Sequence, residues 1–412
     1  MFAILYLASL VVASVLSYIF TDFNLLLSST PWFYQFQSRM WQLSADRTVL
    51  NQAYVVAILV LFCLYILSVR YFSRWQKHIP SRKTLLFIVL LPYFMVFGSY
   101  NSLSHDVFNY IFNARMVLVY QENPHIQVAQ SYPKDTWIRF MHNVHTPAPY
   151  GYGWTLLSLI PSFLGGGVFL LTWLLFRSFM VLSVALLVMA VFWWRDQART
   201  PISLWELVLF FWNPLVAIEV GSNMHNDFWM LVPGVYSLGM LWFMKRPSFK
   251  FILGSMVLLL VSISIKLATI ALIPIWIIIL GMKLAPHTLR LFKNFQLNSG
   301  TWIPIFSSIV LFAPLLTERS KQFLPWYLTW SFVWILFHPR PLSSKLWWWW
   351  FWILSLSFTG LLRYSPWIAT GGYSELVESQ QSLILWWGAA GIWLTAVLVK
   401  AVRTVTKFSN RL

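Results

Sequence analysis

The sequence predicts an all-α polytopic membrane protein, and three observations support this fold class. The 412-residue chain is 59% hydrophobic and 10% charged, whereas soluble domains carry about 25% charged residues. Apolar stretches of membrane-spanning length recur along it, which favours helices over the short alternating strands of a barrel. Lys and Arg cluster between these stretches, as in cytoplasmic loops of membrane proteins. The net charge of +17 therefore indicates membrane orientation and not nucleic-acid binding.

The first apolar stretches predict three membrane crossings before a long polar region. Met1–Phe20 lacks the basic start of a signal peptide, so we expect it to be the first span, running outward from the cytoplasm. An outer loop over residues 21–51 would lead back through Gln52–Val69 to a cytoplasmic basic cluster at residues 70–83. Leu85–Tyr100 would then cross outward again.

The apolar stretch Tyr152–Phe163 is too short to cross a membrane. As a helix it would be about 18 Å long, against a hydrocarbon core of roughly 30 Å. We therefore expect it to be re-entrant or interfacial, and Val168–Trp194 to be the next full span. If Tyr152–Phe163 crossed the membrane, Lys245, Arg246 and Lys250 would face outward, against the positive-inside rule.

The remaining stretches complete a predicted bundle of about twelve transmembrane helices with both termini in the cytoplasm. Most Lys and Arg then lie inside, while the acidic residues other than Asp196 and Glu206 lie on or near the outer side. This predicts a single domain over residues 1–412 in the cytoplasmic (inner) membrane. Two of its spans are short, as expected of helices that break at a buried site. The remaining spans are Leu204–Val220, Phe228–Met244, Phe251–Ile265, Leu267–Met282, Trp302–Leu316, Trp326–Phe337, Leu346–Leu362 and Leu383–Val399.

Residues 103–167 are predicted to form a large extracytoplasmic loop that carries the chemistry. Its segment 104–154 contains three of the twelve acidic residues and four of the eight histidines. Ionisable groups at membrane depth are costly, so they are usually functional or paired. We therefore place the candidate active site in this loop.

Several polar motifs that are distant in sequence would meet at the outer face. Ser104-His105-Asp106 follows the third span, and the segment 221–227, GSNMHND, joins two later spans. Lys266 lies between two short spans, and Trp326-Tyr327 begins another. The sequence therefore predicts an outer cavity that contains carboxylates, imidazoles, at least one cation and aromatic rings.

Some of these residues also have a structural interpretation. Asp106 could cap the amphipathic helix that follows it. Arg115 could be a surface charge or could bind a phosphate in a bidentate manner. Asn123-Pro124 is typical of a helix end. Arg177, within a span, is expected to bind backbone or a neighbouring helix and not substrate.

The later residues leave similar alternatives open. His225 and Asp227 could form a satisfied polar loop or could bind substrate. Lys266 could snorkel to the interface, pair with Glu219, or bind a lipid phosphate. Trp326-Tyr327 could be interfacial aromatics or a platform for a sugar ring.

A cavity with carboxylates, a cation and aromatic rings suits a lipid-linked phosphate donor that carries a sugar. The cation would neutralise the leaving phosphate, and a carboxylate would accept the proton of the attacking hydroxyl. Aromatic rings would hold the lipid chain or stack on the sugar. The sequence contains no nucleotide-phosphate loop or dinucleotide fingerprint, as expected where nucleotide sugars are absent.

Several short motifs follow one another in a recognisable order: Asp106-Val107-Phe108-Asn109-Tyr110, Asn123-Pro124, Tyr150-Gly151, Asn213-Pro214, Gly221-x-Asn223-x-His225-Asn226-Asp227, Lys266 and Pro325-Trp326-Tyr327. This set resembles the bacterial and archaeal polyprenyl-phosphate-mannose-dependent mannosyltransferases of the GT-C superfamily, of the MptB-like type. The resemblance extends from about Leu85 to Trp330.

The resemblance implies a GT-C-like bundle and inverting transfer of mannose from a β-linked polyprenyl-phosphate donor to a glycan or glycolipid hydroxyl. It implies that Asp106 is the general base. With the polar motifs above, it predicts a set of substrate-binding residues, in which Lys266 and Arg115 would hold the phosphate. The set is His105, Arg115, Asn123, His145, Tyr150, Glu219, Asn223, His225, Asp227, Lys266, Trp326 and Tyr327.

The chain departs from the pattern of these relatives at two positions within the substrate-contact motifs and in the number of carboxylates. Tyr152 and Met224 stand where the family commonly has Pro and Gly, and His105-Asp106 replaces the Asp-x-Asp pair of some superfamily members. We therefore expect no required cofactor and no protein metal ligands, with a divalent cation as the alternative. Cys63 is the single cysteine, so one chain can form neither a disulfide framework nor a zinc site.

Two other functions fit the same surface. A lipid or glycolipid transporter would use the same cations and aromatic rings, although its polar groups would usually lie at the midplane of matched repeats. A phosphotransferase would move a lipid head group and not a sugar.

Overall fold

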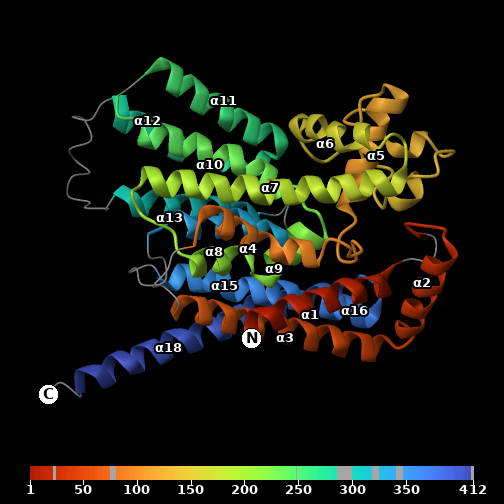
Figure 1. Cartoon of the computed structure of the whole chain (residues 1–412), viewed down its shortest axis with the longest axis horizontal. Coiled ribbons are helices and arrows are strands. Elements are labelled where there is room, and N and C mark those ends of the chain that lie inside the picture. Colours follow the sequence, from red (N-terminus) through yellow and green to blue (C-terminus); the bar gives the residue numbers. More distant parts are fainter. Residues whose placement is uncertain are drawn as a thin grey trace.

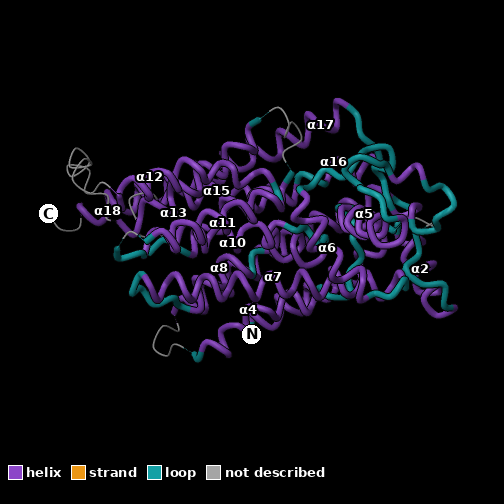
Figure 2. The backbone as a smooth tube through the Cα atoms, turned by 90° about the horizontal axis from the view of Figure 1, so that it is seen from above, coloured by secondary structure: helices purple, strands orange, loops and turns teal. Residues whose placement is uncertain are grey.

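The computed structural model describes residues 1–21, 25–74, 80–246, 248–284, 299–317, 324–339 and 347–409. Within these ranges the elements are helices and helical turns, and no strand occurs. Most of the long helices run along the long axis of the molecule (Figure 1). α2, α5 and α6 lie at one end of the bundle, opposite the C-terminal end of α18 (Figures 1 and 2).

The helices follow one another along the chain with short connections. The first nine are α1 (Phe2–Leu16), α2 (Pro31–Leu43), α3 (Arg47–Arg74), α4 (Arg82–Met95), α5 (Asp106–Tyr120), α6 (Tyr152–Leu164), α7 (Phe169–Gln197), α8 (Leu204–Phe211) and α9 (Pro214–Val216). The others are α10 (Asp227–Phe243), α11 (Phe249–Ile265), α12 (Ile273–Leu284), α13 (Ser299–Phe312), α14 (Leu328–Phe332), α15 (Trp347–Leu362), α16 (Ser365–Thr370), α17 (Glu375–Ser382) and α18 (Gly388–Ser409).

The lengths of these helices agree with a polytopic membrane protein. Five described helices are long and apolar enough to cross a membrane: Phe2–Phe20, Arg47–Arg74, Phe169–Gln197, Leu267–Leu284 and Glu375–Lys400. A sixth results if Leu204–Phe211 and Pro214–Ser222 form one bent span. Other expected spans, such as α11, are shorter helices. The expectation of about twelve crossings, with both termini inside, stays a prediction.

Two segments differ from the sequence expectation. The expected outer loop over residues 21–51 contains α2 and the first turn of α3. α2 buries Phe33, Gln37 and Trp41, which recur every four residues and so share one helical face. Its low overall hydropathy explains why a search for membrane spans overlooks it.

The expected span Leu204–Val220 is bent in the structure. α8 and α9 meet at an angle of 55° beside Asn213-Pro214. Pro214 has no N–H to donate, and the Asn213 side chain accepts a hydrogen bond from the amide of Leu215 at 3.0 Å, which starts a new helix. A π-helical turn, Ala217–Ser222, continues α9. Such turns often occur at functional sites.

A buried arginine fixes the position of this π-helical turn. Arg177 of α7 donates hydrogen bonds to the carbonyl oxygens of Gly221 at 2.7 Å and Ser99 at 2.7 Å. It also contacts the carbonyl oxygens of Val96 and Ser222. The prediction that Arg177 binds backbone is therefore confirmed. Its contacts join the segment before α5 to the segment before α10, which together carry the candidate site.

α6 matches the expectation for Tyr152–Phe163. It is a separate short apolar helix, and Gly165, Gly166 and Gly167 lead directly into α7. Gly166 and Gly167 have φ values of +57° and +79°, which glycine adopts readily, so the chain can reverse tightly here. Whether α6 is re-entrant or interfacial stays a prediction.

Candidate active site

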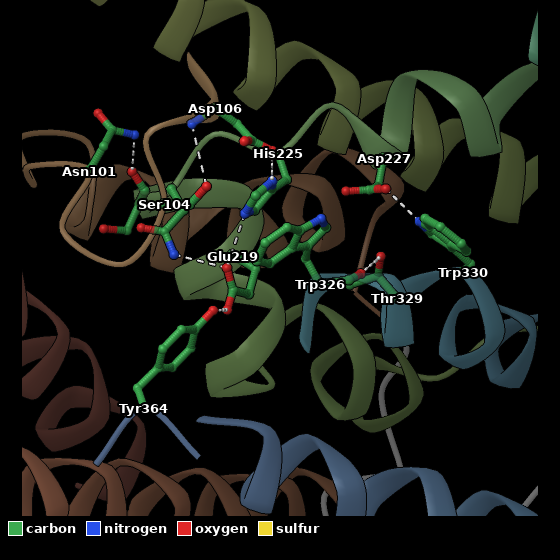
Figure 3. Close-up of polar contacts among 12 residues, drawn as sticks. Asn101, Ser104, Asp106, Glu219, His225, Asp227, Trp326, Thr329, Trp330 and Tyr364 are labelled. Atoms are coloured by element: carbon green, nitrogen blue, oxygen red, sulfur yellow. Dashed lines mark hydrogen bonds and ion pairs between the residues drawn. The ribbon is translucent and has the colours of Figure 1, made fainter. Parts of the chain in front are cut away.

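Breaks between helices bring the predicted polar residues together inside the bundle (Figure 3). Asp106 begins α5, Glu219 lies in the π-helical turn, and Asp227 begins α10. Lys266 follows the end of α11 in an extended conformation. Figure 3 shows Trp326, Trp330 and Tyr364 approaching this cluster from segments later in the chain.

His225 lies between two carboxylates at the centre of the cluster. Its Nδ1 atom is 3.2 Å from Asp106 Oδ2, and its Nε2 atom is 3.3 Å from Glu219 Oε2. The His225 and Glu219 side chains are fully buried, whereas the Asp106 side chain is 22% exposed. The cluster therefore presents Asp106, and not Glu219, to open space.

The two carboxylates keep His225 charged. Burial alone would lower the pKa of His225, but the contacts and charges of Asp106 and Glu219 outweigh burial and raise it to about 9. The ring also stacks on Trp326, with centroids 3.8 Å apart and planes 15° apart. A protonated imidazole on an aromatic face gains a further cation–π contribution.

Asp106 is held in its ionised form. Burial opposes its charge, but the contacts with His225, a hydrogen bond from Tyr150 and the charge of Lys266 outweigh burial and hold the pKa of Asp106 below its usual value. The N-cap residue of α5 is His105, and Asp106 belongs to its first turn. Its carboxylate points to His225 (Figure 3). Asp106 therefore does not act as the N-cap.

Lys266 forms a second ion pair in the cluster. Its Nζ atom donates a hydrogen bond to Asp227 Oδ1 at 2.7 Å, and Trp330 Nε1 donates to the same oxygen. The ammonium group also lies 4.9 Å from the ring centroid of Tyr327 and 5.1 Å from that of Trp330. The partner of Lys266 is thus Asp227 and not Glu219, the partner considered from sequence.

A close backbone approach fixes Lys266 relative to the outer loop. The amide of Gly151 donates to the carbonyl of Ile265 at 3.2 Å. A Cβ atom on Gly151 would lie only 1.9 Å from the carbonyl oxygen of Ser264, so only glycine fits at this point. Because Tyr150 precedes this contact and Lys266 follows it, the contact sets the separation of the Asp106 and Lys266 subsites.

We predict that Gly151→Ala lowers the transfer rate about 100-fold, because a shift of about 1 Å in catalytic groups has effects of this size. Gly98→Ala is the matched control, since a Cβ there meets no atom within 4 Å. Rates and circular dichroism of both purified variants check this. Equal activity of the two variants would show that the close backbone approach at Gly151 does not affect the transfer rate.

Met224 adopts a left-handed conformation beside His225. Its φ value is +60°, which glycine favours and larger side chains rarely adopt. This is the position where the resembled family commonly has Gly. The backbone geometry therefore agrees with the family pattern although the side chain differs, and Met224 is fully buried.

Four predicted residues lie outside the central contacts. Arg115 pairs with Asp135 at 2.5 Å and stacks on Trp137, so its described contacts stay within the outer loop. Asn123 accepts a hydrogen bond from the amide of His125 just after α5 ends, as expected of a helix end. The other two are His105, whose ring packs against that of His142 at a tilt of 46°, and His145, which is exposed.

Three residues of the cluster were not among the predicted site residues. Trp330 binds Asp227, and Tyr364 donates a hydrogen bond to Glu219 Oε1 at 3.2 Å. Tyr110 lies edge-on to Tyr150 at 4.9 Å. Tyr110 stands in the motif that begins at Asp106, but no role was assigned to it. The local sequence around Trp330 and Tyr364 does not indicate contacts with Asp227 and Glu219, because these contacts depend on how distant helices pack.

The described residues contain no group of three or more His, Cys, Asp or Glu side chains that could hold a metal ion. Asp106, His225 and Glu219 are instead engaged with one another. The expectation of no metal ligands therefore stays a prediction.

The fold is that of a helical membrane protein whose ionisable side chains meet where helices break. The chain belongs to the MptA/MptB family: the family model described as alpha-(1->6)-mannopyranosyltransferase, N-terminal domain, matches residues 8–282, more than half of the chain. The protein is therefore a mannosyltransferase, with a sugar donor and a glycan acceptor. No curated protein and no solved structure matches the chain.

The family match covers one part of the candidate site. Asp106, Glu219, His225, Asp227 and Lys266 lie within residues 8–282. The aromatic residues Trp326, Trp330 and Tyr364, which contact them, lie beyond it. The site is therefore completed by the later part of the chain.

Proposed function

We propose that the protein transfers mannose from a polyprenyl-phosphate donor to a hydroxyl of a glycan or glycolipid at the outer face of the cytoplasmic membrane. The observation that carries this proposal is that a membrane mannosyltransferase has a partly exposed carboxylate, Asp106, near enough to Lys266 for the lysine's charge to help lower the pKa of Asp106. One group can take up a proton and the other can bind a phosphate. Transfer to an acceptor hydroxyl requires both.

Asp106 is the proposed general base. The acceptor oxygen attacks the anomeric carbon as the bond from that carbon to the phosphate oxygen breaks, and the hydroxyl proton passes to Asp106. Attack on the face opposite the leaving phosphate inverts the configuration, so a β-linked donor gives an α-linked product. His225 holds the carboxylate ionised and in place, as its 3.2 Å contact supports.

Lys266 is the proposed phosphate ligand. Its side chain is 12% exposed, whereas Asp227 behind it is fully buried, so a phosphate would approach the lysine from its open side. The ammonium group would stabilise the charge that develops on the leaving polyprenyl phosphate. The contacts of Lys266 with Tyr327 and Trp330 already direct it toward the cluster.

Other polar atoms of the cluster suit a sugar. Asn223 Oδ1, both side-chain polar atoms of Asn226, and Asp227 Oδ2 are buried and have no hydrogen-bond partner among the described residues. Buried polar atoms are normally paired. We propose that sugar hydroxyls supply these partners, and that Trp326 provides an apolar wall beside them.

Because Lys266 can meet the phosphate charge, we propose that transfer requires no metal ion. EDTA should then leave the rate of the purified enzyme unchanged, and added Mg²⁺ or Mn²⁺ should not raise it. Loss of activity in EDTA with recovery on adding a divalent cation would contradict this proposal.

The identity of the lipid product tests the proposed function against its alternatives. Purified protein in detergent should convert polyprenyl-phosphate-mannose and an acceptor into a mannoside and polyprenyl phosphate, both followed by mass spectrometry. A product that carries the phosphate would indicate head-group transfer. Movement of the lipid across sealed vesicles without any glycosidic product would indicate a transporter.

The proposed role of His225 predicts that the transfer rate falls at high pH. Since its pKa is raised to about 9, His225 is protonated below that pH and loses a proton above it. A neutral ring has one N–H and can serve only one of the two carboxylates, so the rate should fall as the pH rises through about 9.

Glu219→Gln removes one negative charge beside His225 and should lower its pKa, so the fall in rate should begin at a lower pH. Rate–pH profiles of wild type and Glu219→Gln check this, and superimposed profiles would contradict it. The other titratable or charged groups around the pair of carboxylates include Tyr54, Tyr110, Tyr150, Asp227, Lys266, Arg363 and Tyr364.

A further inference from the structure

Glu219 connects the candidate base to a residue far along the chain. Glu219 Oε2 contacts His225 Nε2 at 3.3 Å and accepts a hydrogen bond from Asn223 Nδ2 at 2.8 Å. Glu219 Oε1 accepts a hydrogen bond from the Tyr364 hydroxyl at 3.2 Å. Figure 3 shows these side chains forming a line from Tyr364 through Glu219 and His225 to Asp106.

Tyr364 is itself held by the surrounding helices. It is buried and immediately precedes α16, which packs against α3. Its neighbour Arg363 is also buried and donates a hydrogen bond to Gln381 Oε1 of α17 at 3.2 Å. The Tyr364 hydroxyl is thus a fixed donor, because the backbone on both sides of it is packed against the bundle.

We propose that Tyr364 is a positioning residue that acts on the Asp106 base through Glu219 and His225. The inference rests on the proposed function, because it concerns the same base. Tyr364 fixes one oxygen of Glu219, and the other oxygen is therefore turned toward Asn223 and His225. His225 is then held between the two carboxylates, with its ring nitrogens 3.2 Å from Asp106 and 3.3 Å from Glu219.

The contacts that Glu219 already makes favour an indirect role for Tyr364 and Glu219, because both Glu219 oxygens are engaged by Tyr364, Asn223 and His225. Glu219 is fully buried behind His225, and Tyr364 lies behind Glu219. Asp106, on the other side of His225, is the exposed end of the line. An effect of Tyr364 on the rate would therefore be transmitted to Asp106 through Glu219 and His225, and kinetic measurements can test this.

The first test compares Tyr364→Phe with wild type and with Tyr65→Phe. Tyr65 is the matched control: it is also buried and donates one hydrogen bond, to the carbonyl of Leu209 at 2.5 Å. We expect Tyr364→Phe to lower kcat about tenfold with an unchanged KM for polyprenyl-phosphate-mannose, because a hydrogen bond to a charged group is lost. Equal kcat values for the two variants would overturn the proposal.

The second test asks whether Tyr364 acts through Glu219. Glu219→Gln should lower kcat about 100-fold, since it removes a member of a buried polar network. Adding Tyr364→Phe to Glu219→Gln should cause little further loss, because the connection is already broken. Independent losses that multiply in the double variant would overturn a route through Glu219.

A third measurement does not depend on activity. In protein labelled with ¹⁵N-histidine, the ring signals of His225 can be assigned by their absence in His225→Gln. We expect these signals to shift in Tyr364→Phe and Glu219→Gln but not in Tyr65→Phe. Unchanged signals in Tyr364→Phe would overturn the positioning role. If wild type transfers no mannose from the donor, the proposed function fails, and the ring signals still decide whether Tyr364 positions His225.

Discussion

Replacing Asp106 by Asn should lower kcat about 1,000-fold while leaving the KM for the lipid donor nearly unchanged, because general-base catalysis contributes about 10²- to 10⁴-fold. The amide keeps the size of the side chain but cannot accept the acceptor's proton. The change also removes one of the two negative charges that keep His225 protonated. Steady-state release of polyprenyl phosphate would measure the effect.

Asp46→Asn is the matched control for this variant. Asp46 precedes α3 and accepts hydrogen bonds from the amides of Thr48 and Val49, and an asparagine side chain can make the same contacts. It should retain the wild-type rate. If Asp106→Asn is as active as Asp46→Asn and equally stable, Asp106 is not the base.

Replacing Lys266 by Gln should weaken both the fold and donor binding. Asp227 is fully buried, and without its 2.7 Å partner its charge would be left uncompensated. Breaking such a buried pair costs about 3–5 kcal/mol of unfolding free energy. The KM for the lipid donor should rise about 100-fold, because a charge-assisted contact to the phosphate is lost.

The double variant Lys266→Gln/Asp227→Asn separates these two effects. Removing both charges should restore most of the thermal stability, since no buried charge remains unpaired. Donor binding should stay weak, because the cation is still missing. Recovery of donor binding together with stability would show that Lys266 has only a structural role.

Lys283→Gln is a suitable control for Lys266→Gln. Lys283 also lies over an aromatic ring, that of Trp242 at 5.3 Å, and donates a hydrogen bond to the carbonyl of Met244. It lies in the last turn of α12, 17 residues after Lys266 in sequence. Its replacement should leave the KM for the donor unchanged.

Composition and hydropathy were sufficient to predict the membrane class and several helices. The uninterrupted apolar stretch of α7 and the shortness of α6 are both properties of local sequence. α2 was missed because its polar and apolar residues alternate with a helical period and its mean hydropathy is low. The bend at Asn213-Pro214 was missed because hydropathy alone does not register a missing N–H.

The candidate site was predicted in part. The motifs at 104–106 and 221–227 indicated Asp106, His225 and Asp227, and Glu219 was named in the predicted substrate-binding set. The structure brings these side chains together with Lys266. The partners were harder to predict, because they depend on how distant helices pack. Lys266 pairs with Asp227, 39 residues away in sequence, and Tyr364 reaches Glu219 across 145 residues.

The central claim is that this site transfers mannose from a polyprenyl phosphate, and one reaction tests it most directly. Purified wild-type protein would be incubated with synthetic β-linked polyprenyl-phosphate-mannose and a mannoside acceptor, and both products would be identified. We predict stoichiometric release of polyprenyl phosphate and an α-linked mannoside. Failure to release polyprenyl phosphate, or a β-linked product, would contradict the proposed donor or the proposed inversion.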